Sequence, residues 1–144
     1  MITISKAKIK DCPKIVELEK KIRNEDFVSN VYESAAFIKY GFVFIAKDNE
    51  KIIWAIIAFM GKNDIVFVTD FVVDPKYRNY GIWHKLYNKL IKEWKKTIHA
   101  LVWPDYKESI NLHEELWFKL IKKENYPYGS NKKYPMMYLY ELKK

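Results

Sequence analysis

The chain is poor in the residues that staple or interrupt small proteins. Its 144 residues include one cysteine, Cys12, which excludes an internal disulfide and a cysteine-rich zinc site. Glycine occurs four times, so each glycine is expected to mark a turn or a close approach. No segment approaches the roughly 18 consecutive apolar residues of a membrane-spanning helix, and the first residues do not resemble a secretory leader. We therefore expect a cytoplasmic protein without membrane association, in which Cys12 is a buried packing residue.

Metal-binding patterns are also absent from the sequence. The three histidines, His84, His99 and His113, share no spacing typical of metal ligands, and there is no HExxH motif. We expect no metal.

Acidic residues are outnumbered by basic ones, 18 to 26, which gives a net charge of +8. This balance favours anionic partners such as phosphate-bearing ligands, nucleic acid or acidic substrates. The alternative is a solvated, lysine-rich surface with no specific partner. No helix-turn-helix, zinc-finger or RNP-type motif is present, so nucleic-acid binding has no motif to support it.

Hydrophobic residues make up 49% of the chain and aromatic residues 17%, enough for an ordinary core in one domain spanning residues 1–144. Apolar periodicity predicts an α/β fold in the order β-α-α-β-β-β-α-β-α-β, a mixed central sheet flanked by about four helices. We expect strands at 2–5, 42–46, 51–60, 65–73, 98–103 and 136–142, and helices at 12–22, 31–40, 82–95 and 108–123. The aromatic strand 136–142 is a candidate edge for pairing with a second copy, a possible homodimer.

The most informative segment runs from Asp70 to Leu86. An apolar strand leads through Asp74-Pro75 into a short loop, Arg78-Asn-Tyr-Gly81, and a helix follows at once. The first N–H groups of a helix lack partners within the helix and lie at the positive end of its dipole. A strand, a tight turn and a helix start in this order therefore make an anion site suited to phosphate.

This segment resembles the acyl-CoA loop of the GNAT superfamily of N-acetyltransferases. Arg78-x-x-Gly81-x-Trp83 is similar to the family's Q/R-x-x-G-x-G/A motif, and the predicted element order is typical of the GNAT fold across nearly the whole chain. The resemblance implies that acetyl-CoA is the co-substrate. It implies backbone pairing of Val72 and Val73 with the pantetheine arm.

The same resemblance assigns the diphosphate of CoA to the helix start. Amides of Asn79, Tyr80, Gly81, Ile82 and Trp83 are expected to meet the diphosphate, and Arg78 to contact a phosphate. Asn111 matches an asparagine that the family often has near the pantetheine; its alternative role is capping a helix.

Trp83 departs from the family pattern, because glycine or alanine is usual at that position and lets the diphosphate approach the backbone closely. Three placements of the indole are open at this point: pointing away, covering the ligand, or filling the site. Phe118 is a second departure, since it stands seven residues after Asn111, where the family commonly has a tyrosine near the CoA sulfur. Phenylalanine has no proton to give.

Two residues are candidates for acid–base chemistry. Asp70 lies in an otherwise apolar strand, where desolvation raises the pKa of a carboxylate unless a cation or hydrogen bonds counter it. The family often uses an acidic residue of this strand on the amine, so Asp70 is the candidate base; a structural, hydrogen-bonded aspartate is the alternative. Tyr126 is the candidate acid in place of Phe118, with Tyr106 a second option, although ordinary packing accounts for both tyrosines.

The sequence therefore predicts an N-acetyltransferase that moves an acetyl group from acetyl-CoA to a primary amine by direct attack in a ternary complex. The acceptor is not specified by any motif. The alternative is a catalytically inactive GNAT-like module that binds an anionic partner such as nucleic acid, as Trp83 and Phe118 both suggest.

Overall fold

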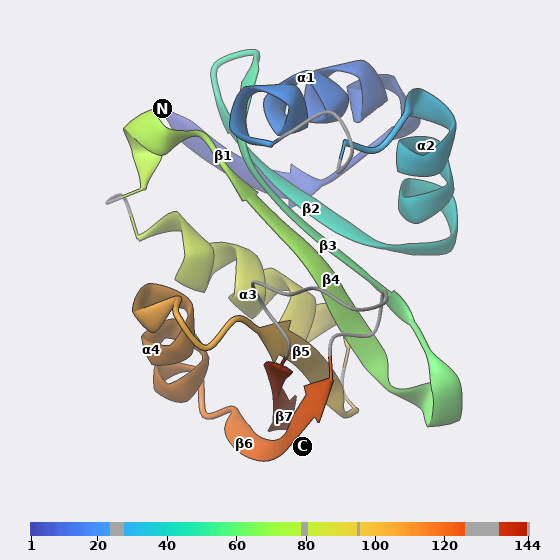
Figure 1. Ribbon diagram of the computed structural model, residues 1–144. Helices are drawn as coiled ribbons and strands as arrows, with labels where there is room; N and C mark the ends of the chain where they lie inside the picture. The colour runs from blue at the N-terminus through green and yellow to red at the C-terminus, as the bar shows by residue number, and fades with distance from the viewer. Residues whose placement is uncertain (24–27, 79–80, 95, 126–135, 144) are drawn as a thin grey trace.

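The structure is a computed structural model that describes residues 1–23, 28–78, 81–94, 96–125 and 136–143. The described residues form one mixed sheet of seven strands in the order β1-β2-β3-β4-β5-β7-β6 (Figure 1). Every neighbouring pair in it is antiparallel except β4 and β5, which run parallel. The predicted α/β architecture, a mixed central sheet flanked by four helices in the described residues, is confirmed.

The elements follow the predicted order as far as the fourth helix. The strands are β1 Ile2–Lys6, β2 Gly41–Asp48, β3 Lys51–Met60, β4 Val66–Val73, β5 Ile98–Val102, β6 Lys119–Asn125 and β7 Met136–Leu142. The helices are α1 Cys12–Ile22, α2 Val31–Tyr40, α3 Ile82–Glu93 and α4 Lys107–Glu115, with short 3-10 turns at Ile9–Asp11, Lys62–Asp64 and Pro75–Tyr77.

Helices α1 and α2 cover one face of the sheet, and α3 and α4 cover the other (Figure 1). Two apolar clusters result, because alternate residues of a strand point to opposite faces. On β4, Val72 belongs to the cluster under α1, whereas Phe71 packs against the cluster under α3. Leu86 and Leu90 of α3 are fully buried, and burial of such a side chain stabilises the fold by about 1.5–3 kcal/mol.

The prediction of one helix over 108–123 is wrong. Helix α4 ends at Glu115, and Trp117 takes a left-handed conformation with φ 69°. The N–H of Phe118 donates to the carbonyl of His113 at 2.9 Å, and the N–H of Trp117 donates to the carbonyl of Glu114 at 3.0 Å. These two bonds form a Schellman motif, which satisfies the last carbonyls and stops the helix. The chain then continues as strand β6, which the sequence reading missed.

One smaller expectation also needs correction. Strand β7 is not an edge, because it lies between β5 and β6, so the predicted pairing of 136–142 with a second copy has no free edge there. The carboxylate of Asp11 does not cap α1; it accepts hydrogen bonds from the Lys8 N–H at 2.8 Å and the Lys47 ammonium at 2.7 Å. Cys12 is buried as expected.

Candidate functional site

Strands β4 and β5 separate at the centre of the sheet. They pair only over Val66–Val68 and Ile98–Ala100, although β4 continues to Val73. A bulge in β4 marks the point of divergence: Ile57 of β3 pairs with Asp70 and Ala58 pairs with Val68, so Thr69 has no partner in the register. A bulge bends its strand and sharpens the local twist. Among the described residues, the β4 segment that contains Val72 and Val73 therefore has no strand beside it on the β5 side.

Helix α3 begins beside this divergence with an uncapped end. Gly81 precedes it in a left-handed conformation, φ 62°, and supplies no side-chain cap. A Cβ added at Gly81 would meet no described atom within 4 Å other than those of its chain neighbours, so the space beside Gly81 is open among the described residues. The first N–H groups of α3 can therefore donate hydrogen bonds to an anionic ligand. Ile82 is 1% exposed and offers only its backbone. Asn79 and Tyr80 lie outside the described residues.

A hollow of about 370 Å³ lies between the start of α3 and helix α4, and we call it the α3–α4 hollow. Its lining brings together four of the predicted site residues, Arg78, Gly81, Trp83 and Asn111. Asn111 is the fifth residue of α4 and exposed, so it does not cap the helix, whose N-cap is Tyr106. The open helix start and an arginine in one hollow fit a phosphate-bearing ligand.

The wall of the α3–α4 hollow also carries groups of both charges. His84 and Glu115 meet across it at 2.7 Å, and Glu108 and Leu112 complete the lining. A ligand that enters this hollow therefore lies beside the His84–Glu115 contact, which joins α3 to α4.

The indole of Trp83 turns onto the aromatic core and forms one wall of the α3–α4 hollow. Its ring centroid lies 5.4 Å from that of Trp54 and 6.1 Å from that of Phe71. The indole N–H donates to the carbonyl of Arg78 at 3.2 Å, which ties the helix to the preceding loop. The indole is therefore turned away from Gly81 and toward the core, and it lines the hollow from that side.

Phe118 lies in the core and not on the face of a long helix. It is 3% exposed and packs edge-on against Tyr87 and His113, with centroids 5.7 and 5.1 Å apart. Counting seven residues from Asn111 assumed a continuous helix, and α4 ends before Phe118. Position 118 lies beyond the end of α4, so the identity of its residue does not indicate whether α4 supplies a general acid.

Tyr87 and His113 form a buried hydrogen-bonded pair that joins α3 to α4. The Tyr87 hydroxyl donates to Nε2 of His113 at 2.6 Å, and Nδ1 of His113 donates to the Ser109 carbonyl at 2.6 Å. Burial lowers the pKa of His113 to about 4, although the Ser109 hydrogen bond acts in the opposite direction. Burial also raises the pKa of the Tyr87 hydroxyl. Both side chains are therefore neutral at neutral pH.

On the opposite face of β4, Asp70 forms an ion pair with Arg23 at the end of α1. The guanidinium Nη2 of Arg23 donates to Oδ1 of Asp70, and the N–H of Phe71 donates to the same oxygen at 2.7 Å. The side chains of Arg23 and Asp70 are 27% and 16% exposed. The sequence left open whether a cation opposes the desolvation of Asp70. In the structure, Arg23 is that cation.

Glu19 lies next to this pair and is completely buried. Its carboxylate accepts the Ser29 N–H at 2.7 Å and the Ser29 hydroxyl at 3.4 Å. Burial raises the pKa of Glu19, the charge of Asp70 adds to that rise, and the Ser29 N–H and Arg23 oppose it. Glu19 thus fixes Ser29 against α1 beside Arg23.

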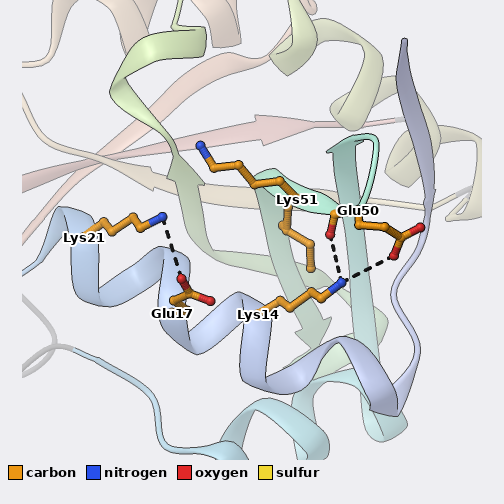
Figure 2. A pocket seen from close by; sticks show the side chains of 6 residues that line it. Lys14, Glu17, Lys21, Glu50 and Lys51 are labelled. Atoms are coloured by element: carbon orange, nitrogen blue, oxygen red, sulfur yellow. Dashed lines mark hydrogen bonds and ion pairs between the residues drawn. The ribbon is translucent and has the colours of Figure 1, made fainter.

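A second hollow, of about 310 Å³, lies between α1 and the β2–β3 turn, and its cations are already paired (Figure 2). Lys14 reaches the Glu50 carbonyl at 2.9 Å and its carboxylate at 3.4 Å, and Lys21 lies 3.8 Å from Glu17. Lys51 extends away from Lys14 in Figure 2.

The ammonium of Lys51 instead reaches the buried carboxylate of Asp74 at 2.6 Å. No charge in this second hollow is left to define a ligand among the described residues. Within the same residues, no group of three or more histidine, cysteine, aspartate or glutamate side chains suits a metal, and no helix is long and apolar enough to span a membrane.

Comparison with known proteins agrees with this geometry. The family model described as acetyltransferase (GNAT) family matches residues 11–118. The chain belongs to the GNAT family. Among curated proteins, no sequence matches it.

Solved GNAT structures superpose on nearly the whole chain. The ribosomal-protein-S18-alanine N-acetyltransferase from Escherichia coli is 23% identical, with a TM-score of 0.80, covering 99% of this chain and 94% of the other. An N-acetyltransferase from Staphylococcus aureus Mu50 is 20% identical, with a TM-score of 0.82 and coverage of 99% and 98%. NAA60 from Arabidopsis thaliana, in complex with acetyl-CoA, is 15% identical, with a TM-score of 0.83 and coverage of 99% and 98%. At these identities the likeness shows the shared fold.

The sequence analysis missed two charged residues beside Asp70, Glu19 and Arg23. A signal for one of them was present, because the 26 basic residues include only two arginines, Arg23 and Arg78. Both lie at the site described above, one against Asp70 and the other in the α3–α4 hollow. Arginine is better suited than lysine to hold a carboxylate or phosphate in a fixed geometry. Tyr126, the predicted acid, lies outside the described residues.

Proposed function

We propose that this GNAT protein is an N-acetyltransferase that transfers the acetyl group of acetyl-CoA to a primary amine by direct attack in a ternary complex. The observation that carries the proposal is the divergence of β4 from β5 beside the uncapped start of α3. An extended thioester arm needs an unpaired strand, and a diphosphate needs free helix N–H groups. Both are present at one point of the fold.

The residues that hold acetyl-CoA in this proposal come from two segments. The backbone of Val72 and Val73 pairs with the pantetheine arm, as an added strand would. The amides from Gly81 to Trp83 meet the diphosphate, with Asn79 and Tyr80 completing the loop. Arg78 contacts a phosphate in this proposal, since the residue lines the α3–α4 hollow. Asn111 contacts the arm from the opposite wall.

The chemistry requires that one bond forms and one breaks. The amine nitrogen forms a bond to the acetyl carbon, the carbon–sulfur bond breaks, and its electron pair leaves with the CoA sulfur. Asp70 receives the amine proton, directly or through water, and Tyr126 returns a proton to the sulfur. Holding both reactants at the divergence supplies much of the rate by proximity.

Packing in the aromatic core accounts for the two departures from the family pattern on which the binding-module alternative depends. Trp83 has a place against Trp54 and Phe71, and Phe118 has one in the core, so neither departure argues for a closed site. The enzyme is therefore the better-supported proposal.

The test is release of free CoA thiol from acetyl-CoA in the presence of a panel of amines, with mass spectrometry of the acceptor. The proposal predicts amine-dependent release and loss of most acetyl-CoA affinity in Arg78→Ala. Lys89→Ala, on the exposed side of α3, is the matched control and keeps full activity. Absence of acetyl transfer to every amine class would contradict the proposal.

A further inference from the structure

The turn that leads from β4 toward α3 is attached to the neighbouring strand β3. Asp74, the residue directly after β4, is 5% exposed, and Oδ2 of its carboxylate accepts the ammonium of Lys51 at 2.6 Å. The N–H of Asp74 donates to the carbonyl of Ile53 at 2.8 Å. Lys51 and Ile53 both belong to β3, so a backbone bond and an ion pair fix the end of β4 to that strand.

The carboxylate of Asp74 also sets the conformation of the turn itself. Its Oδ1 accepts the Lys76 N–H at 3.1 Å, and its main-chain carbonyl accepts the Tyr77 N–H at 2.9 Å. An aspartate that accepts an N–H two residues later forms an Asx turn, which takes the place of a backbone turn. Because Lys51 holds the other oxygen, the same ion pair orients the carboxylate for the turn.

Tyr77 makes a second link between this turn and the β2–β3 hairpin. Its hydroxyl donates to Oδ2 of Asp48, the last residue of β2, at 2.8 Å, and the Lys51 ammonium lies 5.4 Å from the centroid of its ring. Asp48 and Lys51 are opposite each other in the β2–β3 register. We call the two links, Lys51 with Asp74 and Asp48 with Tyr77, the hairpin clamp.

The hairpin clamp ends at the residue before Arg78. On the other side, the carbonyl of Arg78 accepts the indole N–H of Trp83 at 3.2 Å, so Arg78 is attached both to the sheet and to α3. Arg78 and Gly81 line the α3–α4 hollow, and no side chain caps the start of α3. The positions of the groups that can bind a phosphate therefore depend on contacts made outside the hollow.

The Lys51–Asp74 pair is difficult to replace because its carboxylate is buried. The Asp74 side chain is 7% exposed, whereas that of Lys51 is 45% exposed. Burial acts to raise the pKa of Asp74, but the Lys51 ammonium and the Lys76 N–H outweigh it and hold the pKa below its ordinary value. Without Lys51, a buried charge would lose its partner, so the turn would have to move to bring the carboxylate to water.

We propose, on the basis of the acetyltransferase function proposed above, that Lys51 and Asp74 are positioning residues for the diphosphate of acetyl-CoA. They hold the turn that presents Arg78 and the start of α3, and they do not touch the ligand. The β4 backbone at Val72 and Val73 is held separately, by its own pairing with β3. Loss of the clamp therefore weakens the phosphate contacts and leaves the acetyl transfer step unchanged.

The experiment is a calorimetric titration of acetyl-CoA into the parent protein, Lys51→Met and Lys51→Arg. We expect the Kd of Lys51→Met to be at least about tenfold higher than that of the parent, which corresponds to the loss of one hydrogen bond to a charged group. Lys51→Arg keeps the cation and should restore most of the affinity. The kcat of Lys51→Met at saturating acetyl-CoA and the KM of the amine should stay at the parental values.

Lys47→Met is the matched control for a general structural defect. It breaks an ion pair of the same kind in the same hairpin, because the Lys47 ammonium lies 2.7 Å from the buried carboxylate of Asp11, at the start of α1. We expect Lys47→Met to lose stability in urea and to keep the parental Kd for acetyl-CoA. Equal Kd values for Lys51→Met and the parent, or equal losses of affinity in Lys51→Met and Lys47→Met, would overturn the inference.

A milder variant keeps the test decisive if Lys51→Met does not fold. Tyr77→Phe removes only the hydrogen bond to Asp48 and should raise the Kd for acetyl-CoA about threefold; an unchanged Kd would again refute the clamp. The outcomes also separate this inference from the function on which it rests. A parent that binds no acetyl-CoA would remove the proposed function, whereas a parent and a Lys51→Met that bind it equally would overturn the positioning role alone.

Discussion

The two faces of β4 differ in the kind of side chain that packs on them. The side chains packed directly on the α3–α4 face of the strand are aromatic and neutral, with Phe71, Trp83 and the buried Tyr87–His113 pair, and the charged residues of the α3–α4 hollow lie at the surface. The α1–α2 face carries an ion pair, Arg23 with Asp70. Successive residues 70 and 71 supply the two faces, because a strand alternates its side chains. Strand β4 thus separates a surface that borders the α3–α4 hollow from a surface that carries an ion pair.

The difference shows how each face treats buried charge. An unpaired charge inside the aromatic layer would lack compensation, and His113 is accordingly held neutral by burial. On the α1–α2 face each buried charge has a partner: Asp70 has Arg23, and Glu19 has the N–H of Ser29. The comparison predicts that changes at the Arg23–Asp70 pair alter turnover, whereas changes at the Tyr87–His113 pair alter stability.

The largest expected effect is that of Asp70→Asn. Removing the proton acceptor should lower kcat by about 10²- to 10⁴-fold, the usual contribution of a positioned general base, while acetyl-CoA binding stays nearly unchanged. Steady-state kinetics and calorimetry measure the two quantities. Asp64→Asn is the matched control, because Asp64 is an exposed aspartate paired with Lys96 at 3.3 Å. Unchanged turnover in Asp70→Asn would remove Asp70 from the mechanism.

On the neutral face, acid should weaken the fold through His113. The pKa of His113 is about 4 in the folded protein and 6.5 ordinarily, so below pH 6.5 the unfolded chain binds a proton that the folded protein refuses. The free energy of unfolding is therefore unaffected by this group above pH 6.5 and falls as the pH drops toward 4. At pH 5 the loss is about 2 kcal/mol, from 1.36 kcal/mol per pH unit.

Urea unfolding of the parent and of His113→Leu at pH 7 and pH 5 measures this effect. The variant should be less stable at pH 7, because the Tyr87 hydroxyl loses its acceptor, but its stability should fall less between the two pH values, by about 2 kcal/mol. Identical pH dependence in His113→Leu would show that the histidine is not held neutral.

The smallest effect is expected in the second hollow, on the charged side of the sheet. Lys14→Ala breaks an exposed ion pair with Glu50, and such pairs contribute about 0–1 kcal/mol, so stability and kcat/KM should both remain close to the parent. Denaturation and the thiol-release assay check this. A large loss of activity would mean that the second hollow binds substrate. Residues that affect turnover would then not be confined to the Arg23–Asp70 pair.

Most of the fold was predictable because the apolar patterns are strong. The apolar run of β4 on both faces indicated a central strand, and it lies fourth of seven in the sheet order. Helix α4 was extended too far because its stop is Trp117 in a left-handed conformation, which the sequence normally signals with glycine. The apolar residues after it, Leu120 and Ile121, continued the helical spacing and concealed β6.

The candidate site was predictable where a local motif carried it and unpredictable where tertiary contacts did. The loop around Arg78 and Gly81 follows from sequence, since strand, turn and helix start are contiguous. The Arg23–Asp70 pair joins residues 47 positions apart, and nothing local announces it. The position of the Trp83 indole depends on Trp54 of β3 and Phe71 of β4.

The most direct test of the account is a calorimetric titration of acetyl-CoA into the parent protein and into Trp83→Ala. If the indole lies against Trp54 and Phe71 and leaves the start of α3 open, the parent binds in the micromolar range and the variant binds with similar affinity. Binding by Trp83→Ala but not by the parent would contradict the account, because it would mean that the indole closes the cofactor site.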